Sequence, residues 1–71
     1  MNKGMINQII GPVIDIKFDA EHMPELLNSI VIHFQGRNIV AEVAQHVGDD
    51  VARCVALSST EGLTRGMEAE D

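Results

Sequence analysis

Cys54 and His46 are the two residues whose types could support nucleophilic catalysis. They lie on the two arms of a predicted hairpin, so a thiol and an imidazole base could meet across it. The sequence offers neither an orienting carboxylate nor a recognisable oxyanion donor beside them. Cys54 also stands between Ala52 and Ala56, where a thiol serves as a small apolar filler. We therefore interpret Cys54 as a core residue and not as a nucleophile.

Histidine and aspartate side chains could bind a metal ion, but their spacing does not favour such a site. His22, His33 and His46 fall in one loop and two strands, which argues against a three-histidine centre and for positions at the surface or rim. Asp49-Asp50 lacks the alternating oxygen ligands and the distal glutamate of an EF-hand, so we interpret it as part of a hairpin turn. The sequence predicts no catalytic, cofactor-binding or metal-binding residue.

The glycines do not form a phosphate-binding loop. They stand at positions 4, 11, 36, 48, 62 and 66 and never make G-x-x-x-x-G-K-[ST], and neither Lys3 nor Lys17 follows a glycine. These residues are therefore not expected to bind ATP. Gly62-x-x-x-Gly66 has the spacing of paired membrane helices but lacks their apolar span, so it indicates a turn. Ser58-x-x-Glu61 fits a capping box, which favours one helical turn or a tight loop over a serine nucleophile.

The elements that carry these residues are predicted to be strands. Runs rich in Val and Ile recur about every ten residues between Gly, Pro, Asn and Asp, a pattern typical of a small all-β barrel. The predicted strands are residues 4–10, 13–18, 29–34, 39–47 and 51–57. Tight turns are expected at 35–38 and 48–50. Residues 19–28 are predicted to form a loop with one helical turn that begins at Pro24.

Alternation of apolar residues assigns a core face to three of these strands. The three core-facing sets are Ile14, Ile16 and Phe18; Ile30, Ile32 and Phe34; and Ile39, Ala41 and Val43. Asp15, Lys17 and His33 are expected on the opposite, solvated faces. In residues 51–57, a small set opposes a larger one, and the sequence leaves open which is inside. The two sets are Ala52, Cys54 and Ala56, and Val51, Arg53, Val55 and Leu57.

The length and the net charge of the chain limit the classes of protein to which it can belong. A chain of 71 residues has room for one small domain, whose core rarely nets more than about 3–5 kcal/mol without a staple or a partner. The net charge of −6 and only two aromatic residues, Phe18 and Phe34, argue against a nucleic-acid partner. The single cysteine cannot form an internal disulfide. The chain has no apolar run of membrane-spanning length and no recognisable signal peptide, so we expect a cytoplasmic protein without membrane insertion.

Four segments resemble the start of the catalytic beta subunits of rotary, proton-translocating ATP synthases. They are QIIGPVIDIKF, MPELLNSIVI, EVAQHVGDD and ALSSTEGLTRGM, and together they cover nearly the whole chain. The most specific parts are residues 9–15, 42–48 and 60–66, which follow the order and approximate gaps of that family. Alpha subunits and the vacuolar and flagellar ATPases share this kind of barrel, but the AQH and TEGLTRG segments resemble the beta version.

The resemblance implies that residues 1–71 are one N-terminal domain, a six-stranded antiparallel, Greek-key-like β-barrel. Its last strand is expected to be truncated near Asp71, which would leave an open seam through which an isolated segment could self-associate. The implied partners are the barrels of neighbouring alpha subunits in the alternating hexamer ring. The implied location is the cytoplasm, peripheral to the inner face of the cell membrane in the parent complex.

The resemblance assigns no catalytic residue to this chain. In the family, the P-loop, the catalytic glutamate and the site for Mg-ATP or Mg-ADP come later in the subunit, so the enzyme activity belongs to the parent. One alternative is a free-standing small barrel that binds a protein or a ligand, which a complete sixth strand would favour. Another is an oligonucleotide-binding barrel, which charge and aromatic content oppose.

Overall fold

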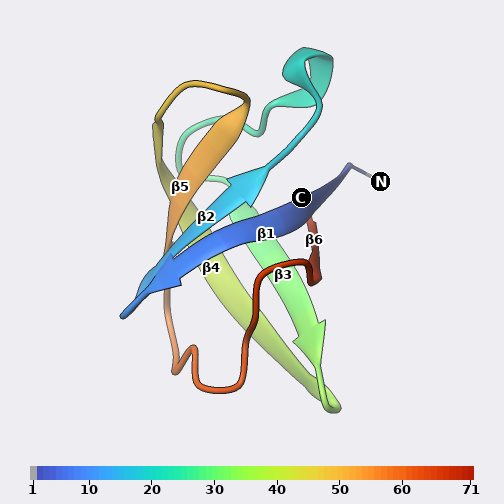
Figure 1. Ribbon diagram of the computed structural model, residues 1–71, viewed down its shortest axis with the longest axis vertical. Helices are drawn as coiled ribbons and strands as arrows, with labels where there is room; N and C mark the ends of the chain where they lie inside the picture. Colours follow the sequence, from blue (N-terminus) through green and yellow to red (C-terminus); the bar gives the residue numbers. More distant parts are fainter. Residues whose placement is uncertain (1) are drawn as a thin grey trace.

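A computed structural model describes residues 2–71 as a closed antiparallel barrel of six strands (Figure 1). The strands are β1 (Lys3–Ile10), β2 (Val13–Lys17), β3 (Ser29–Phe34), β4 (Arg37–His46), β5 (Val51–Ala56) and β6 (Glu68–Glu70). Around the barrel they follow the order β1-β2-β5-β4-β3-β6. The predicted six-stranded barrel is confirmed. Among these residues, no helix has the length and apolar character needed to cross a bilayer.

Bulges explain the imperfect alternation of β1 and β4. In β1 the register with β2 shifts between Ile6 and Gln8, so Asn7 is an additional residue and two adjacent polar side chains both reach solvent. Ile9 then returns to the core side. In β4 a similar shift between Val43 and Gln45 ends the buried face of the strand.

The face of β5 that lies inside the barrel is the one with the small residues. Ala52 and Cys54 are fully buried and Ala56 is 9% exposed, whereas Val55 is 40% exposed. Ile14 and Ile16 of β2 lie directly opposite Cys54 and Ala52. Small side chains on β5 therefore leave room for large ones on the neighbouring strand, as a narrow barrel requires. The three core-facing sets predicted for the other strands are buried as expected, except that Phe34 is only half-buried.

The loop between β2 and β3 contains a helical turn, but not where it was predicted. The turn is the 3-10 segment η1 (Ala20–His22), and it ends before Pro24. Met23 precedes the proline and is extended, with φ −67° and ψ 131°, because a residue before proline disfavours helical geometry. Leu27 then adopts a positive φ of 73° while its N–H donates to the carbonyl of Val43 at 2.8 Å. The predicted helical start at Pro24 is therefore wrong.

The turns at the two ends of the barrel are mostly where the sequence placed them. Gln35 and Gly36 both have positive φ, 49° and 75°, which suits a two-residue hairpin, so β4 begins at Arg37 and the turn is shorter than predicted. Gly48, Asp49 and Asp50 also have positive φ and join β4 to β5 as expected.

The expected open seam is wrong, because β6 closes the barrel. Its residues pair with β1 at three positions and with β3 at one, Val31 opposite Glu70. Ala69, at the centre of β6, is 1% exposed. Asp71 lies beside Asn2 (Figure 1), and the N–H of Asp71 donates to the carbonyl of Asn2 at 2.8 Å. Three residues are sufficient to bridge the gap between β1 and β3.

Candidate functional site

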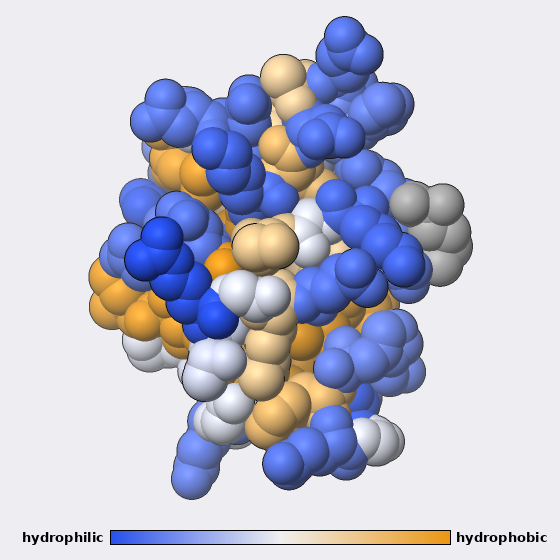
Figure 2. All heavy atoms as spheres, turned by 45° about the vertical axis from the view of Figure 1, so that its right-hand side comes forward, coloured by the Kyte–Doolittle hydropathy of each residue, from blue (hydrophilic) through white to orange (hydrophobic). Residues whose placement is uncertain are grey.

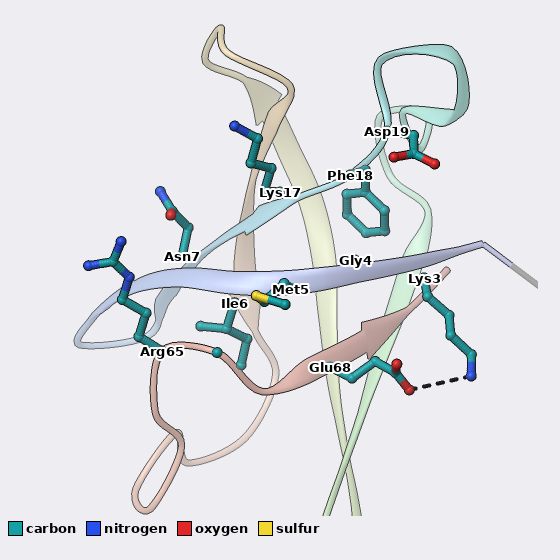
Figure 3. A pocket seen from close by; sticks show the side chains of 11 residues that line it. Lys3, Gly4, Met5, Ile6, Asn7, Lys17, Phe18, Asp19, Arg65 and Glu68 are labelled. Carbon is teal, nitrogen blue, oxygen red and sulfur yellow. Dashed lines mark ion pairs between the residues drawn. The ribbon is translucent and has the colours of Figure 1, made fainter.

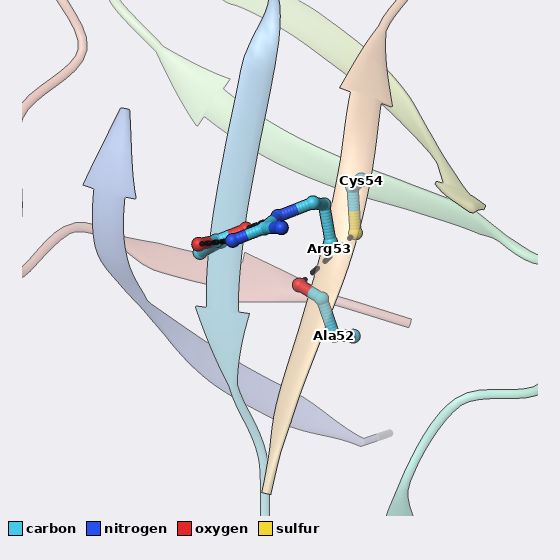
Figure 4. Close-up of polar contacts among 4 residues, drawn as sticks. Ala52, Arg53 and Cys54 are labelled. Carbon is cyan, nitrogen blue, oxygen red and sulfur yellow. Dashed lines mark hydrogen bonds and ion pairs between the residues drawn. The ribbon is translucent and has the colours of Figure 1, made fainter. Parts of the chain in front are cut away.

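Cys54 is a buried thiol with little nucleophilic character. Its side chain is fully buried inside the barrel, and its S–H donates a weak hydrogen bond to the carbonyl of Ala52 at 3.7 Å (Figure 4). Burial, and secondarily the negative charge of Asp15, raises the pKa of Cys54 to about 12. A thiol in this state is protonated at neutral pH, which agrees with its interpretation as a core residue.

His46 lies outside the barrel and does not form a pair with Cys54. Its Nε2 is 2.6 Å from the carbonyl oxygen of Pro24 and, because a carbonyl can only accept, this nitrogen carries a proton and donates it. The imidazole thereby ties the end of β4 to the β2–β3 loop. The structure thus separates the two residues that sequence spacing had brought together, one in the core and one at the surface.

The remaining histidines are also surface residues, as predicted. His33 is exposed on β3, with Nδ1 2.7 Å from Oδ1 of Asn38 and Nε2 4.0 Å from Oε1 of Glu70. His22 is exposed on η1. Within the described part of the chain, no three His, Cys, Asp or Glu residues converge as metal ligands.

Asp15 and Arg53 form a clamp that sequence analysis missed. Arg53 donates from Nε and Nη2 to the two carboxylate oxygens of Asp15, at 2.9 and 3.0 Å (Figure 4). Asp15 was expected on a solvated face, but Arg53 covers it and leaves it 7% exposed. The hydrogen bonds that Arg53 donates to Asp15, and then the negative charge of Asp15, raise the pKa of Arg53. The two residues are direct neighbours in the β2–β5 register, which a single sequence does not reveal.

This clamp is structural. A carboxylate whose two oxygens both accept from one guanidinium is held in a fixed geometry. The pair spans β2 and β5 on the outside of the barrel, directly behind the buried positions of both strands. It therefore fixes the register of these strands and does not provide a general base.

The outer surface carries an apolar belt that crosses several strands. Ile10, Val55 and Leu57 are 63%, 40% and 69% exposed. Half-buried outward-facing valines connect them: Val13 opposite Val55 and Ile10, Val40 hydrogen-bonded to Leu57, and Val31 opposite Val40. We call these six residues the apolar belt. Figure 2 shows hydrophobic atoms at the surface between hydrophilic ones on the face that it presents.

An apolar belt of this kind is the strongest functional feature of the surface. Contiguous exposed apolar surface is uncommon on monomeric proteins and marks sites of protein contact. The apolar belt is therefore the candidate interaction surface of the barrel.

The chain was compared with models of known protein families. The model described as "ATP synthase alpha/beta family, beta-barrel domain" matches residues 6–71. The match spans β1 from Ile6 onward and every later strand of the barrel.

Proposed function

We propose that this chain, which belongs to the ATP synthase alpha/beta family as its beta-barrel domain, is the N-terminal barrel of the catalytic beta subunit and holds that subunit in the alternating alpha/beta ring. The observation that carries the proposal is the apolar belt on the outside of a barrel of this family. The barrel domain of the family is not catalytic. ATP synthesis or hydrolysis, the Mg-ATP or Mg-ADP site and the coupled proton transport are assigned to the parent subunit and its complex.

The belt supports a contact with a neighbouring barrel. Leu57 and Ile10 are both more than half exposed, and each stands beside other apolar side chains on the outside of the sheet. Covering such side chains removes apolar surface from water, which favours association. A barrel seated between two neighbours in a ring would bury this surface. We infer that the alpha subunit supplies the covering face.

Two sequence segments support the beta assignment over the alpha. Residues 42–48 comprise the end of β4, where His46 binds the β2–β3 loop, and the start of the turn to β5. Residues 60–66 lie in the connection from β5 to β6. Both segments resemble the beta version of the barrel. With this assignment, we expect the domain in the cytoplasm, in a complex that is peripheral to the inner face of the cell membrane.

The test is complex formation with the alpha subunit of the same ATP synthase. We expect sedimentation velocity to show a heterocomplex of this chain with the alpha subunit and no comparable complex with a second beta-type barrel. Leu57→Asp in the belt should weaken the complex. Leu27→Asp is the matched control, because Leu27 is 71% exposed, close to the 69% of Leu57, and lies in the β2–β3 loop outside the belt. Absence of any complex with wild-type chain would refute the proposal.

A free-standing binding module remains the second candidate. Closure of the barrel by β6 favours it, since all six strands pair within this chain. The same experiment discriminates between the two: a free-standing module would show no preference for the alpha subunit.

A further inference from the structure

Three of the five Lys and Arg residues of this acidic chain line one hollow on the barrel surface. The hollow has a volume of about 600 Å³ and runs along β1 between the end of β2 and the segment that leads into β6 (Figure 3). Its outer lining includes Lys3, Met5, Asn7, Lys17, Arg65 and Glu68. We call these six residues the Met5 groove. Positive charge is thus concentrated at one place on a molecule whose net charge is −6.

Met5 lies at the centre of the groove. It is 57% exposed, and the strand register places Lys17 of β2 directly opposite it on one side and Glu68 of β6 on the other. Beneath it, Ile6 and Phe18 form a buried floor at 1% and 4% exposure. A flexible apolar side chain surrounded by a charged rim is the usual anatomy of a protein contact site.

The cations of the groove divide into two groups. Lys3 is paired with Glu68, at 3.4 Å between Nζ and Oε1, whereas Lys17 and Arg65 form no ion pair with any residue from 2 to 71. Figure 3 shows Lys17, Asn7 and Arg65 on one side of Met5 and the Lys3–Glu68 pair on the other. The side that holds Lys17 and Arg65 therefore has two uncommitted positive charges and a neutral amide.

Acidic residues border the groove and limit where an anion can bind. Asp19 lines it beside Phe18, and Asp49 and Asp50 lie near Lys17 in the adjoining hollow. An anionic partner is therefore favoured along β1 between Lys17 and Arg65, and is repelled from the end of the barrel that carries the β4–β5 turn. This asymmetry would fix the direction in which a partner segment lies.

We propose that the Met5 groove is a second interaction face, distinct from the apolar belt, which binds an acidic segment of the other ring neighbour with an apolar side chain against Met5 and carboxylates against Lys17 and Arg65. The belt is built mainly on β2, β5, β4 and β3, whereas the groove is built mainly on β1, with the last residue of β2, Arg65 of the segment before β6 and the first residue of β6. A member of a closed ring needs two different faces, one for each neighbour. The proposal rests on the proposed function for the identity of the partner, but not for the acidic, partly apolar chemistry of the segment.

The first experiment uses the alpha-subunit complex and variants of equal net charge. Lys17→Gln with Arg65→Gln, and Arg37→Glu alone, each change the charge from −6 to −8, that is −6 − 2. We expect the groove double variant to weaken the complex at least about tenfold and to flatten its dependence on salt concentration, and the Arg37 control to change it less than about twofold. Met5→Gln should weaken it as well, with Leu26→Gln as the control of equal 57% exposure.

The second experiment tests the groove without the alpha subunit. An acetylated, amidated peptide of alternating Glu and Leu is titrated into the ¹⁵N-labelled chain, with sodium sulfate as a separate arm. We expect peptide shifts at residues 3–7, 17–19 and 65–68 that are lost in the Lys17, Arg65 double variant, and much smaller shifts from sulfate. Equal shifts from sulfate, or peptide shifts outside these residues, would overturn the inference.

The outcomes separate the two proposals. No complex of wild-type chain with the alpha subunit refutes the proposed function, and the peptide titration still decides the groove. A complex that the belt variant weakens and the groove variants leave unchanged overturns the groove while the proposed function stands.

Discussion

Native Cys54 should react with thiol reagents at least about a thousandfold more slowly than the same residue in the unfolded chain. Its pKa rises from an ordinary 9.0 to about 12 in the folded barrel, and three pH units correspond to about a thousandfold less thiolate near pH 8. Since only the thiolate attacks, the rate falls by that factor before access is considered. Full burial of the side chain slows the reaction further, because the reagent has to wait for the barrel to open.

The assay is a time course of labelling by an aromatic disulfide at about pH 8, with the chain in urea as the reference for an accessible thiol. The rate is measured at several reagent concentrations, since a rate that becomes independent of concentration reports barrel opening. A small peptide with one cysteine corrects for the effect of urea on the reagent. Native labelling within about tenfold of the unfolded rate, with the circular dichroism of the fold intact, would refute the assignment of Cys54 as an inert core residue.

The structure also predicts how stability responds to alkaline pH and to single substitutions, and whether the chain binds Mg-ATP. The pKa of Cys54 is higher in the folded state, so the buried thiol contributes fully to the free energy of unfolding below about pH 9. That contribution is lost as the pH rises toward about 12, by at most about 1.4 kcal/mol per pH unit. In urea unfolding, the free energy of unfolding of the Cys54→Ala variant should therefore fall less at alkaline pH than that of the wild-type chain. Gly62→Ala should destabilise the fold by about 1–3 kcal/mol in thermal unfolding, because φ is +92° and a Cβ would lie 2.7 Å from the Phe34 ring. Gly66→Ala, at φ +96° with open space around it, should show the backbone strain alone. Ala69→Asp should release β6, because it places a carboxylate at a position that is 1% exposed, and hydrogen exchange should then rise along β1 and β3 relative to Ala69→Ser. Calorimetry with Mg-ATP should detect no saturable binding at micromolar concentration, since the chain lacks the phosphate-binding glycine loop.

The alternation of apolar and polar residues predicted the parts of the fold that depend only on neighbouring residues in the sequence. Alternation identified the buried faces of β2, β3 and β4, because in a strand the direction of a side chain depends only on its position. It was less clear for β1, where a bulge at Asn7 adds a residue that no repeat of two can anticipate. The helical start predicted at Pro24 failed because Leu27 has a positive φ of 73°, and its N–H donates to the carbonyl of Val43 on β4 instead of continuing a helix.

The features that sequence analysis missed depend on pairing between distant strands. The Asp15–Arg53 clamp joins residues 38 positions apart, and it exists because β2 lies beside β5 in one register. The three cations of the Met5 groove come from β1, β2 and the segment before β6. Closure of the barrel by a strand of three residues also lay beyond local prediction, because so short a segment has no periodicity of its own.

The segment before β6, residues 60–66, shows why a sequence without catalytic residues can still require particular residue types at particular positions. The hydroxyl of Thr60 donates to a carbonyl in the β1–β2 turn at 2.8 Å, and Leu63 is buried at 8% exposure. Gly62 has a positive φ and leaves no room for a Cβ beside the ring of Phe34. The N–H of Gly66, whose φ is also positive, donates to a carbonyl of β1 at 2.8 Å.

Thr60, Gly62, Leu63 and Gly66 hold the connection at one end of the barrel and set the direction in which the chain enters β6. Thr60 and Leu63 anchor the connection to the turn and to the core, and the two glycines supply the backbone geometry that side chains would obstruct. Arg65 is also exposed, and it is the residue of this segment whose charged side chain lines the Met5 groove. Packing explains the constrained positions of the TEGLTRG segment, and its cation, Arg65, belongs to the face that we propose for contact with a partner. A segment that closes the barrel therefore also presents a charge at a fixed place on its surface.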